Sequence, residues 1–338
     1  MGENLNGKHF RTKKFSGFKM NDSVVMNWDE IASLLSQINV HEAMKNAFIE
    51  YSKGNSEIPP VGELLFEDPP GEVHIKYGYI KGGSHYVVKI ASGFPDNQKL
   101  KMKPGQGMML LFDINSGLPR AILIDDANLT DLRTGIAGAI SSELLALQGI
   151  DSASIIGSGV QARYQIRCLV DLLPLRGIKI WARNAQKAKD LINDLRDLNV
   201  DIEFKDDLES LVKESKLIVT TTSSREPLIE SDWVQPGTHI TAVGSDTPEK
   251  CELEPKLLSR ASVIVADSIS QNKLRGEIHQ ALKVKCISEN DLIELGELLD
   301  DKQEGRTDDQ QISIADLTGV AVQDLVIAEA VYNAKIGA

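Results

Sequence analysis

The sequence predicts an α/β protein in which a doubly wound, parallel Rossmann sheet is joined to a smaller α+β domain. Two observations indicate this architecture. From Ser152 onward, short apolar runs alternate with helical stretches, which is typical of strand–helix–strand units with parallel strands. Before that point, short apolar segments are separated by turns such as Pro69-Pro70-Gly71 and Gly82-Gly83, which is typical of an antiparallel sheet.

The first half of the chain is expected to begin with two short helices, Trp28–Gln37 and His41–Tyr51. The strands expected after them are Val61–Phe66, Val73–Ile80, Tyr86–Ala91, Met108–Phe112 and Pro119–Ile124. A longer helix is expected over Leu129–Leu147. Small residues in this helix, such as Gly135 and Gly138, would let it pack closely against the next domain.

The most informative stretch of the chain starts with the apolar strand Ser154–Ile156 and continues into a glycine turn and a helix. This order places backbone N–H groups and a helix N-terminus where a dinucleotide pyrophosphate can sit. Gly157 would allow the tight turn, and Gly159 would let the phosphate approach the backbone. Ala162 takes the place of the usual third glycine, where only a small residue is needed. The sequence therefore predicts a dinucleotide site here.

The next strand, Ile178–Trp181, bears on the choice of coenzyme. NAD-specific sites usually carry Asp or Glu at its end, to accept a hydrogen bond from the ribose 2′-hydroxyl. Here Ala182 and Arg183 occupy that place, and a guanidinium can pair with a 2′-phosphate. This favours NADPH, with NADH use left open. Alternatively, Arg183 is a solvated residue that opens a helix over Ala185–Leu195.

The rest of the chain continues the alternation of strands and helices. The further strands expected are Ile202–Phe204, Leu217–Thr220, Thr238–Val243 and Ser262–Val265. An acidic stretch, Asp300–Gln310, is expected to be an exposed loop, and a last helix over Val320–Lys335 is expected to return to the first domain. We therefore expect a substrate-binding and dimerisation domain over residues 1–128 plus 320–338, and a Rossmann domain over residues 129–319.

Composition excludes several classes of protein. The chain has 338 residues, 42% of them hydrophobic, and its net charge of −12 argues against a nucleic-acid partner. Three widely spaced cysteines match neither a metal site nor a disulfide framework, so free, buried thiols are expected and no metal is predicted. No apolar run is long enough to span a membrane, and the basic N-terminal segment lacks the apolar core of a signal peptide. The expected compartment is the cytoplasm.

Five short segments form one further pattern when they are taken in order. They are Val87-Val88-Lys89-Ile90, Leu129-Thr130-Asp131-Leu132-Arg133-Thr134, Gly157-Ser158-Gly159-Val160-Gln161-Ala162, Ala242-Val243-Gly244-Ser245-Asp246 and Thr318-Gly319-Val320-Ala321-Val322-Gln323-Asp324. Together they resemble the ornithine cyclodeaminase/mu-crystallin family over most of residues 28–335. The resemblance implies a Rossmann domain joined to a dimer-forming sheet domain, with a small-molecule substrate held between them and a homodimer as the assembly.

The resemblance also implies roles for individual residues. Lys89 and Arg133 match the family's cationic substrate contacts, and Asp246 matches its acid/base. Lys89 and Asp246 are thus the expected catalytic residues, and Gly319 would lie beside the nicotinamide and the substrate. The expected coenzyme-binding residues are Gly157, Gly159, Val160, Gln161, Arg183, Thr220, Thr221, Val243, Gly244 and Val320.

These residue types suit an α-imino acid, which carries a carboxylate and a C=N carbon that must accept hydride. Lys and Arg can hold the carboxylate. The C=N nitrogen must be protonated for hydride transfer, and a nearby carboxylate such as Asp246 can stabilise the iminium or relay its proton. A buried Lys89 could equally deliver that proton, because desolvation lowers a lysine pKa. Whether Lys89 or Asp246 is the donor is left open.

Each of these residues also has a plainer interpretation. Lys89 could be a charge on an edge strand, and Arg133 could lie on a solvated helix face. Asp246 precedes Thr247-Pro248 and could cap a turn.

The segment before the second strand departs from the family pattern. Many members carry an arginine near Pro59-Pro60, which this chain lacks, and His74 stands where the ornithine-specific pattern has an acid. His74 and Lys76 share one face of the expected strand, because side chains alternate along it. Lys76 could therefore replace the missing arginine as a carboxylate contact, and both residues disfavour a substrate with a second ammonium group. Alternatively, both lie at the surface of an edge strand.

We therefore expect NAD(P)H-dependent reduction of a ketimine, such as Δ1-pyrroline-2-carboxylate, to an L-amino acid such as proline. The alternative enzyme is an ornithine cyclodeaminase, which would release ammonia without net turnover of NAD. The alternative outside catalysis is a mu-crystallin-like protein that binds NADPH and a small ligand.

Overall fold

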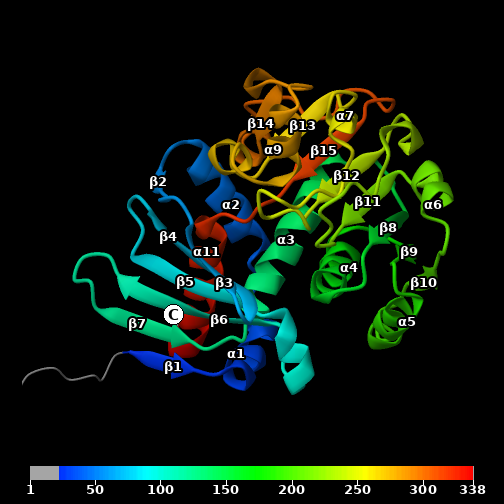
Figure 1. The fold of residues 1–338 in the computed structure, drawn as a ribbon. Helices are drawn as coiled ribbons and strands as arrows, with labels where there is room; N and C mark the ends of the chain where they lie inside the picture. The colour runs from blue at the N-terminus through cyan, green and yellow to red at the C-terminus, as the bar shows by residue number, and fades with distance from the viewer. Residues whose placement is uncertain (1–22, 338) are drawn as a thin grey trace, which may run out of the picture.

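The computed structural model describes residues 23–337, and it contains two β-sheets with helices packed on them (Figure 1). The sequence predicts that the basic N-terminal segment is not a signal peptide. This segment belongs to residues 1–22, which lie outside the described residues. No helix in the described range is long and apolar enough to cross a membrane. The α/β fold class predicted from the sequence is confirmed.

The first sheet is largely antiparallel, with strand order β1-β7-β6-β5-β4-β2 and with β3 paired to β4. The bounds of its strands are β1 Val24–Met26, β2 Ser56–Glu57, β3 Gly62–Glu67, β4 Pro70–Ile80, β5 His85–Gly93, β6 Gly105–Asp113 and β7 Pro119–Leu123. The five strands predicted here are confirmed with small shifts at their ends, whereas β1 and β2 were not predicted.

The central position of β4 and β5 decides one alternative that the sequence left open. β5 pairs with β4 on one side and with β6 on the other, and β4 pairs with β5, β3 and β2. Lys76 and Lys89 are directly opposite each other in the β4–β5 register. Both lysines therefore lie on interior strands, and the edge-strand interpretation is wrong for both.

The C-terminal helix α11, Ala321–Ile336, lies against the inner face of this sheet, together with α1, Trp28–Leu34, and α2, His41–Ser52 (Figure 1). Its apolar side chains pack onto the sheet in one core with Val87, Met109 and Leu111. The first half of the helix, Ala321–Ala328, is completely buried, whereas the second half is partly exposed. The return of the chain to the first sheet therefore agrees with the sequence, although the domain boundaries themselves stay a prediction.

The second sheet has eight parallel strands in the order β10-β9-β8-β11-β12-β15-β13-β14. Their bounds are β8 Ser152–Ile156, β9 Gly177–Trp181, β10 Asp201–Phe204, β11 Leu217–Thr220, β12 His239–Ala242, β13 Val263–Ala266, β14 Leu292–Glu294 and β15 Ser313–Asp316. The strands β8, β11, β12, β13 and β15 are almost completely buried, as expected for a parallel sheet covered on both faces. β15 is inserted between β12 and β13.

The helices around this sheet are α3 Asn128–Leu145, α4 Val160–Leu172, α5 Ala185–Asp194, α6 Leu208–Glu214, α7 Pro255–Leu258, α8 Ile269–Asn272, α9 Gly276–Lys283 and α10 Leu295–Leu299. α3 packs tightly on α4. A Cβ at Gly135 would come within 2.9 Å of Cys168 Sγ, and one at Gly138 would collide with the Gln165 side chain. Small residues are therefore required there, as the sequence indicated.

All three cysteines are free thiols, in agreement with the sequence. Cys168 and Cys251 are buried as predicted. Cys286 is only half-buried, so for this residue the prediction was wrong. It follows the short helix α9 near the surface, where the apolar core no longer covers it on every side.

Candidate functional site

A cavity of about 430 Å³ opens at the carboxyl ends of the second sheet. The chain reverses direction across the sheet at this point, because β9 and β10 lie on one side of β8 while β11 and the strands after it lie on the other. Open α/β sheets bind ligands at such a switch point. The cavity is lined by Gly157, Ser158, Gly159, Trp181, Ala182, Arg183, Asn184, Lys187, Thr221, Thr222, Ser223, Ser224 and Leu228.

The glycine turn after β8 forms one wall of this cavity. Gly157 has φ of +131°, and a Cβ there would collide with the Thr221 hydroxyl. Gly159 is the N-cap of α4 and provides no side-chain cap, while the space above its Cα is open. The first N–H groups of α4 are therefore left without a side-chain partner, which fits an anionic group such as a pyrophosphate.

The rim of the cavity carries two cations. Arg183 and Lys187 are both exposed there, and the Asn184 side chain accepts a hydrogen bond from the Lys187 N–H at 3.1 Å. Ala182 stands at the strand end, and no residue that lines the cavity is a carboxylate. Lys187 was not predicted from the sequence. The rim of the cavity therefore carries positive charge.

Several other predicted coenzyme residues lie at neighbouring strand ends but do not line the cavity. Thr220 is fully buried and donates its hydroxyl to Glu252 Oε2 at 2.7 Å, and the Gly244 N–H donates to the same oxygen at 2.9 Å. Val243 is buried, and its N–H donates to the Thr220 carbonyl. Glu252 thus joins the ends of β11 and β12. Burial and the nearby Glu277 raise the pKa of Glu252 to about 8.

Three more predicted residues lie at helix N-termini. Val160 is the first residue of α4 and is 45% exposed, while the Gln161 amide donates to Asp131 Oδ1 at 2.8 Å. Val320 is the N-cap of α11. Gln161 therefore links α4 to α3. The residue it contacts on α3, Asp131, precedes Arg133 by two residues. Contacts between these residues and a coenzyme stay a prediction.

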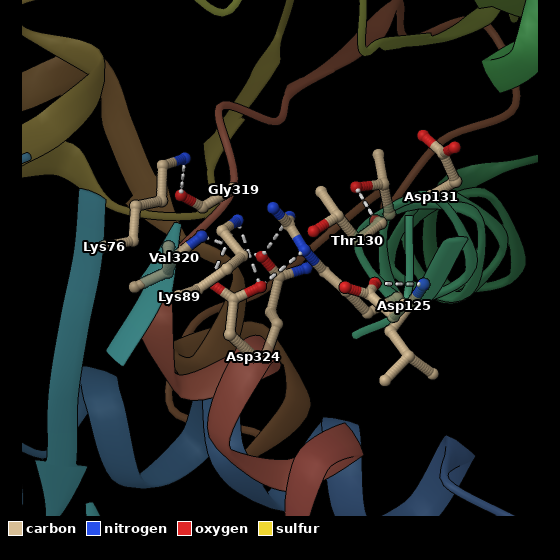
Figure 2. Close-up of polar contacts among 12 residues, drawn as sticks. Lys76, Lys89, Asp125, Thr130, Asp131, Gly319, Val320 and Asp324 are labelled. Carbon is tan, nitrogen blue, oxygen red and sulfur yellow. Dashed lines mark hydrogen bonds and ion pairs between the residues drawn. The ribbon is translucent and has the colours of Figure 1, made fainter. Parts of the chain in front are cut away.

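Lys76, Lys89 and Arg133, from β4, β5 and α3, form what we call the cation cluster. Figure 2 shows Lys89 pointing toward Asp324 of α11, with Lys76 beside Gly319. Lys89 Nζ lies 3.1 Å from Asp324 Oδ2, and Arg133 Nε lies 3.0 Å from Asp324 Oδ1. All three cations and Asp324 are buried. Segments far apart in the sequence therefore meet at one carboxylate.

Lys76 contacts a different group. Its Nζ donates to the Thr318 carbonyl at 2.9 Å and to the Gly319 carbonyl at 2.6 Å. Asp267 holds the same turn from the other side, because its carboxylate accepts the Gly319 N–H at 2.6 Å and the Thr318 hydroxyl at 3.2 Å. Gly319 has φ of +82°, and a Cβ there would press against the Arg133 guanidinium.

Among the described residues, Asp324 is the one carboxylate that forms ion pairs with these cations, while Asp125, Asp246 and Asp267 act on them from farther away. Burial, reinforced by Lys89 and Arg133, lowers the pKa of Lys76 to about 7, and burial together with Arg133 lowers the pKa of Lys89 to about 8. Burial would raise the pKa of Asp324, but the surrounding cations lower it below its ordinary value. Three buried cations around one paired carboxylate would be stabilised by a further anion, such as a substrate carboxylate.

Asp246 lies in the loop after β12 and is half-buried. Its Oδ1 accepts a hydrogen bond from Lys250 Nζ at 2.5 Å, which is an ion pair rather than a backbone cap. Burial raises its pKa, but Lys250, Lys76 and His74 outweigh this and lower it overall. Asp246 is therefore ionised at neutral pH.

His74 shares the inner face of β4 with Lys76 and is partly covered. Its Nε2 lies 3.9 Å from Glu63 Oε1 and 4.0 Å from Glu72 Oε2. Burial lowers the pKa of His74 below its ordinary value. Arg275 Nη2 lies 2.8 Å from Glu63 Oε1. Glu63 belongs to β3 of the first sheet and Arg275 precedes α9 beside the second sheet, so this ion pair connects the two parts of the molecule.

Asp324 is the site residue that sequence reasoning missed. It stood within the last of the five segments but was given no role. A usable signal was present, because Asp324 and Gln323 interrupt the apolar run Ala321–Ala328 of a helix expected to be buried. A lone acid in such a helix needs a cationic partner.

Comparisons with known proteins identify one family and several solved structures that this chain resembles. The model of the ornithine cyclodeaminase/mu-crystallin family matches residues 21–337. An uncharacterized cyclodeaminase of Sinorhizobium fredii is 40% identical over 279 residues, which cover 82% of this chain and 84% of that protein.

Two solved structures share the fold over nearly the whole chain. An archaeal alanine dehydrogenase dimer with bound NAD is 30% identical, with a TM-score of 0.84 and coverage of 93% of this chain and 96% of that one. The iminosuccinate reductase of Paracoccus denitrificans in complex with NAD⁺ is 29% identical, with a TM-score of 0.84 and coverage of 93% and 97%.

Proposed function

The chain belongs to the ornithine cyclodeaminase/mu-crystallin family, and from this premise we propose that it reduces an α-imino acid to an L-amino acid with NADPH. The observation that carries the proposal is the buried surplus of positive charge in the cation cluster. An uncompensated buried charge is costly, so a site with three cations and one paired carboxylate is suited to an anionic ligand. The carboxylate of an α-imino acid is such a ligand.

Lys89 and Arg133 are the proposed contacts of the substrate carboxylate. Asp324 holds both side chains in place, with its two oxygens shared between them. Arg133 is held further by Gln323, whose Oε1 accepts from Nη1 at 3.0 Å. Preorganised cations of this kind fix the orientation of a bound carboxylate and so present the C=N carbon in one direction.

Asp246 is proposed to stabilise the iminium form of the substrate. Because Asp246 is ionised, it can balance the positive charge on a protonated C=N nitrogen, which makes the neighbouring carbon a better hydride acceptor. A nicotinamide coenzyme, when bound, supplies the hydride. The glycine turn and the N-terminus of α4 would hold its pyrophosphate.

The preference for NADPH rests on Arg183 and Lys187 at the rim of the cavity, where Ala182 takes the place of an acid. Two exposed cations can pair with a 2′-phosphate, whereas no carboxylate lines the cavity to accept a hydrogen bond from a ribose 2′-hydroxyl. NADH would still use the same turn and helix N-terminus.

The substrate is proposed to be a ketimine without a second ammonium group, such as Δ1-pyrroline-2-carboxylate or a linear imine of a 2-oxo acid. His74 and Lys76 support this choice, since neither is an acid. A second candidate is an ornithine cyclodeaminase, which Glu63 and Glu72 beside His74 favour, because carboxylates can hold a terminal ammonium. Glu63 is already paired with Arg275, which weakens that candidate.

We propose a homodimer formed through the outer face of the first sheet. Antiparallel sheets normally have one polar face, but the central strands here carry apolar side chains on both faces. Tyr86 and Phe112 stack on the outer face with ring centroids 4.8 Å apart, and Tyr77 is 38% exposed. A second copy of the chain would cover this face. Analytical ultracentrifugation should give the mass of a dimer, and Tyr86→Lys should shift it to the monomer.

The reaction is tested by following NADPH and NADH oxidation with cyclic and linear imino acids, with an ammonia assay for ornithine plus NAD⁺ in parallel. Coenzyme oxidation with an imine supports the reductase, ammonia release without net coenzyme turnover supports the cyclodeaminase, and tight binding without turnover supports a binding protein.

Asp246→Asn provides a second test. It should lower kcat by about 10²–10⁴-fold while coenzyme binding is unchanged, because general acid–base or electrostatic help at the reacting nitrogen is lost. Glu249→Gln, an exposed carboxylate in the same loop, is the matched control and should leave kcat unchanged. Full activity in Asp246→Asn would remove this residue from the mechanism.

A further inference from the structure

The three members of the cation cluster differ in what neutralises them. Lys89 and Arg133 both form ion pairs with Asp324. Lys76 forms no ion pair with any carboxylate in the part of the chain that the structure describes, and its Nζ contacts only the carbonyls of Thr318 and Gly319. Its ammonium group is thus held by dipoles, not by a counter-charge. Lys76 is therefore the cation that can lose its proton without breaking an ion pair.

The geometry at Lys76 Nζ favours the transfer of one particular proton. An ammonium has three N–H donors, and two of them point to the two carbonyls. The third is left for another acceptor. After this proton leaves, the neutral amine still has two N–H groups for the same carbonyls, and its lone pair takes the place of the lost proton. The surrounding structure need not change.

Loss of a proton from Lys89 would have a different consequence. Its Nζ lies 3.2 and 3.1 Å from the two carboxylate oxygens of Asp324, which is fully buried. Loss of the Lys89 proton would break the ion pair between Lys89 and that carboxylate, and breaking a buried ion pair is costly. Asp246 is ionised and has no proton to give. Neither of the two donors considered from the sequence therefore fits as well as Lys76.

We propose that Lys76 is the catalytic residue that donates a proton to the imine nitrogen, an inference that rests on the proposed reductase function. In this step an N–H bond forms at the substrate and an Nζ–H bond breaks at Lys76, which becomes a neutral amine. The C=N electron pair then moves to nitrogen as hydride from the coenzyme reaches carbon. The imine is reduced, the coenzyme is oxidised, and Lys76 regains its proton from solvent.

The charged groups around Lys76 come from every element that packs against it. Lys89 lies directly opposite on β5, Arg133 comes from α3, and both disfavour the protonated form. Asp324 from α11 and Asp246 from the loop after β12 favour it, but burial outweighs them, and the pKa falls to about 7. His74 lies on the same strand, and Asp267 binds the Thr318–Gly319 turn that Lys76 contacts. Lys76 can thus both hold and release a proton near neutral pH.

Lys76→Arg separates proton donation from charge. Arginine keeps the positive charge and can bind a carboxylate, but it does not release a proton near neutral pH. We expect kcat for imine reduction to fall by about 10²–10⁴-fold, with KM for the imine and the binding of NADPH little changed. The wild-type kcat should decline as pH rises through about 7, and this decline should be absent in the variant. Lys81→Arg, an exposed lysine just beyond β4, should match the wild type.

A second measurement needs neither coenzyme nor turnover. The rate at which trace acetic anhydride acetylates Lys76 in the wild-type protein, followed by mass spectrometry as a function of pH, reports the pKa of its amine. Titration near 7 to 8 supports the proposal even if Lys76→Arg does not fold. Titration above 10, or a Lys76→Arg protein that keeps its kcat within threefold, overturns it. Wild-type protein that reduces no imine overturns the proposed function instead, while the acetylation result still decides whether Lys76 can lose its proton.

Discussion

The coenzyme cleft and the cation cluster are built in opposite ways. The part of the cleft that suits a pyrophosphate is formed by backbone, namely a glycine turn and the N–H groups of a helix N-terminus, within a few residues of sequence. The cation cluster is formed by charged side chains from β4, β5 and α3, two of which pair with Asp324 of α11. The cleft should therefore be sensitive to any added Cβ, whereas the cluster should be sensitive to any change of charge.

The largest effect is expected for Asp324→Asn, which removes the shared partner of Lys89 and Arg133. Two buried cations would then lack their carboxylate, and the free energy of unfolding should fall by about 3–5 kcal/mol. Urea denaturation measures this change. Glu329→Gln on the same helix breaks a more exposed pair with His85, and it should cost less than about 1 kcal/mol. Equal costs for the two variants would mean that the cluster is not stabilised by Asp324.

A somewhat smaller effect is expected for Gly157→Ala in the cleft. The left-handed φ and the collision with the Thr221 hydroxyl together should cost about 3 kcal/mol of stability. Gly159→Ala is the matched control, because its φ of −82° is ordinary and the space around it is open. This control should keep its melting temperature but bind coenzyme more weakly. If both variants melted alike, the turn would not depend on glycine at residue 157.

The dependence of stability on pH should reveal a buried neutral side chain, His239, in contrast to the buried charges of the cation cluster. His239 lies at the centre of the second sheet between Ser313 and Thr241, and burial lowers its pKa to about 3. In the unfolded chain the pKa of this histidine is about 6.5. At a pH between the folded and unfolded pKa values, unfolding is therefore accompanied by the uptake of a proton.

This histidine's contribution to stability is therefore full above pH 6.5 and is lost as pH falls toward 3. Acidification from 6.5 to 5 should cost about 2 kcal/mol through His239 alone. The measurement is urea denaturation of the wild type and of His239→Gln at both pH values. The same loss in both proteins would rule out His239 as its cause.

The smallest expected effect is at the rim of the cleft. Arg183→Ala should weaken NADPH binding about tenfold and leave NADH binding nearly unchanged, since one exposed ionic hydrogen bond to the 2′-phosphate is lost. Fluorescence titration with both coenzymes measures the ratio. Arg196→Ala, an exposed arginine that does not line the cavity, should change neither. An equal loss of affinity for both coenzymes would show that Arg183 does not bind the 2′-phosphate.

The same contrast explains what could be predicted from the sequence. Gly157 and Gly159 were found because a backbone site leaves a contiguous pattern, and both line the cavity. Six strands of the second sheet were found because their apolar runs alternate with helices, whereas β14 and β15 were not predicted as strands. β1 and β2 were missed because two or three residues carry no readable period.

Asp324 was missed for a different reason. It is 235 residues from Lys89 in the sequence, so nothing local connects the two. The family resemblance supplied roles for Lys89 and Arg133 but not for the carboxylate that holds them. Likewise, the contact of Lys76 with the Thr318–Gly319 turn depends on how two sheets meet, which no single segment encodes.

The chain passes between the two sheets only twice within residues 23–337, once through residues 124–127 before α3 and once through residues 317–320 after β15. β15 is hydrogen-bonded on both sides, so the second crossing is anchored in the middle of its sheet. The two crossings define a line, and a rotation of one sheet relative to the other about this line would leave both chain connections intact. Admission of a substrate by such a rotation would break the Arg275–Glu63 ion pair, while Gly319 and Asp324, near this line, would move least.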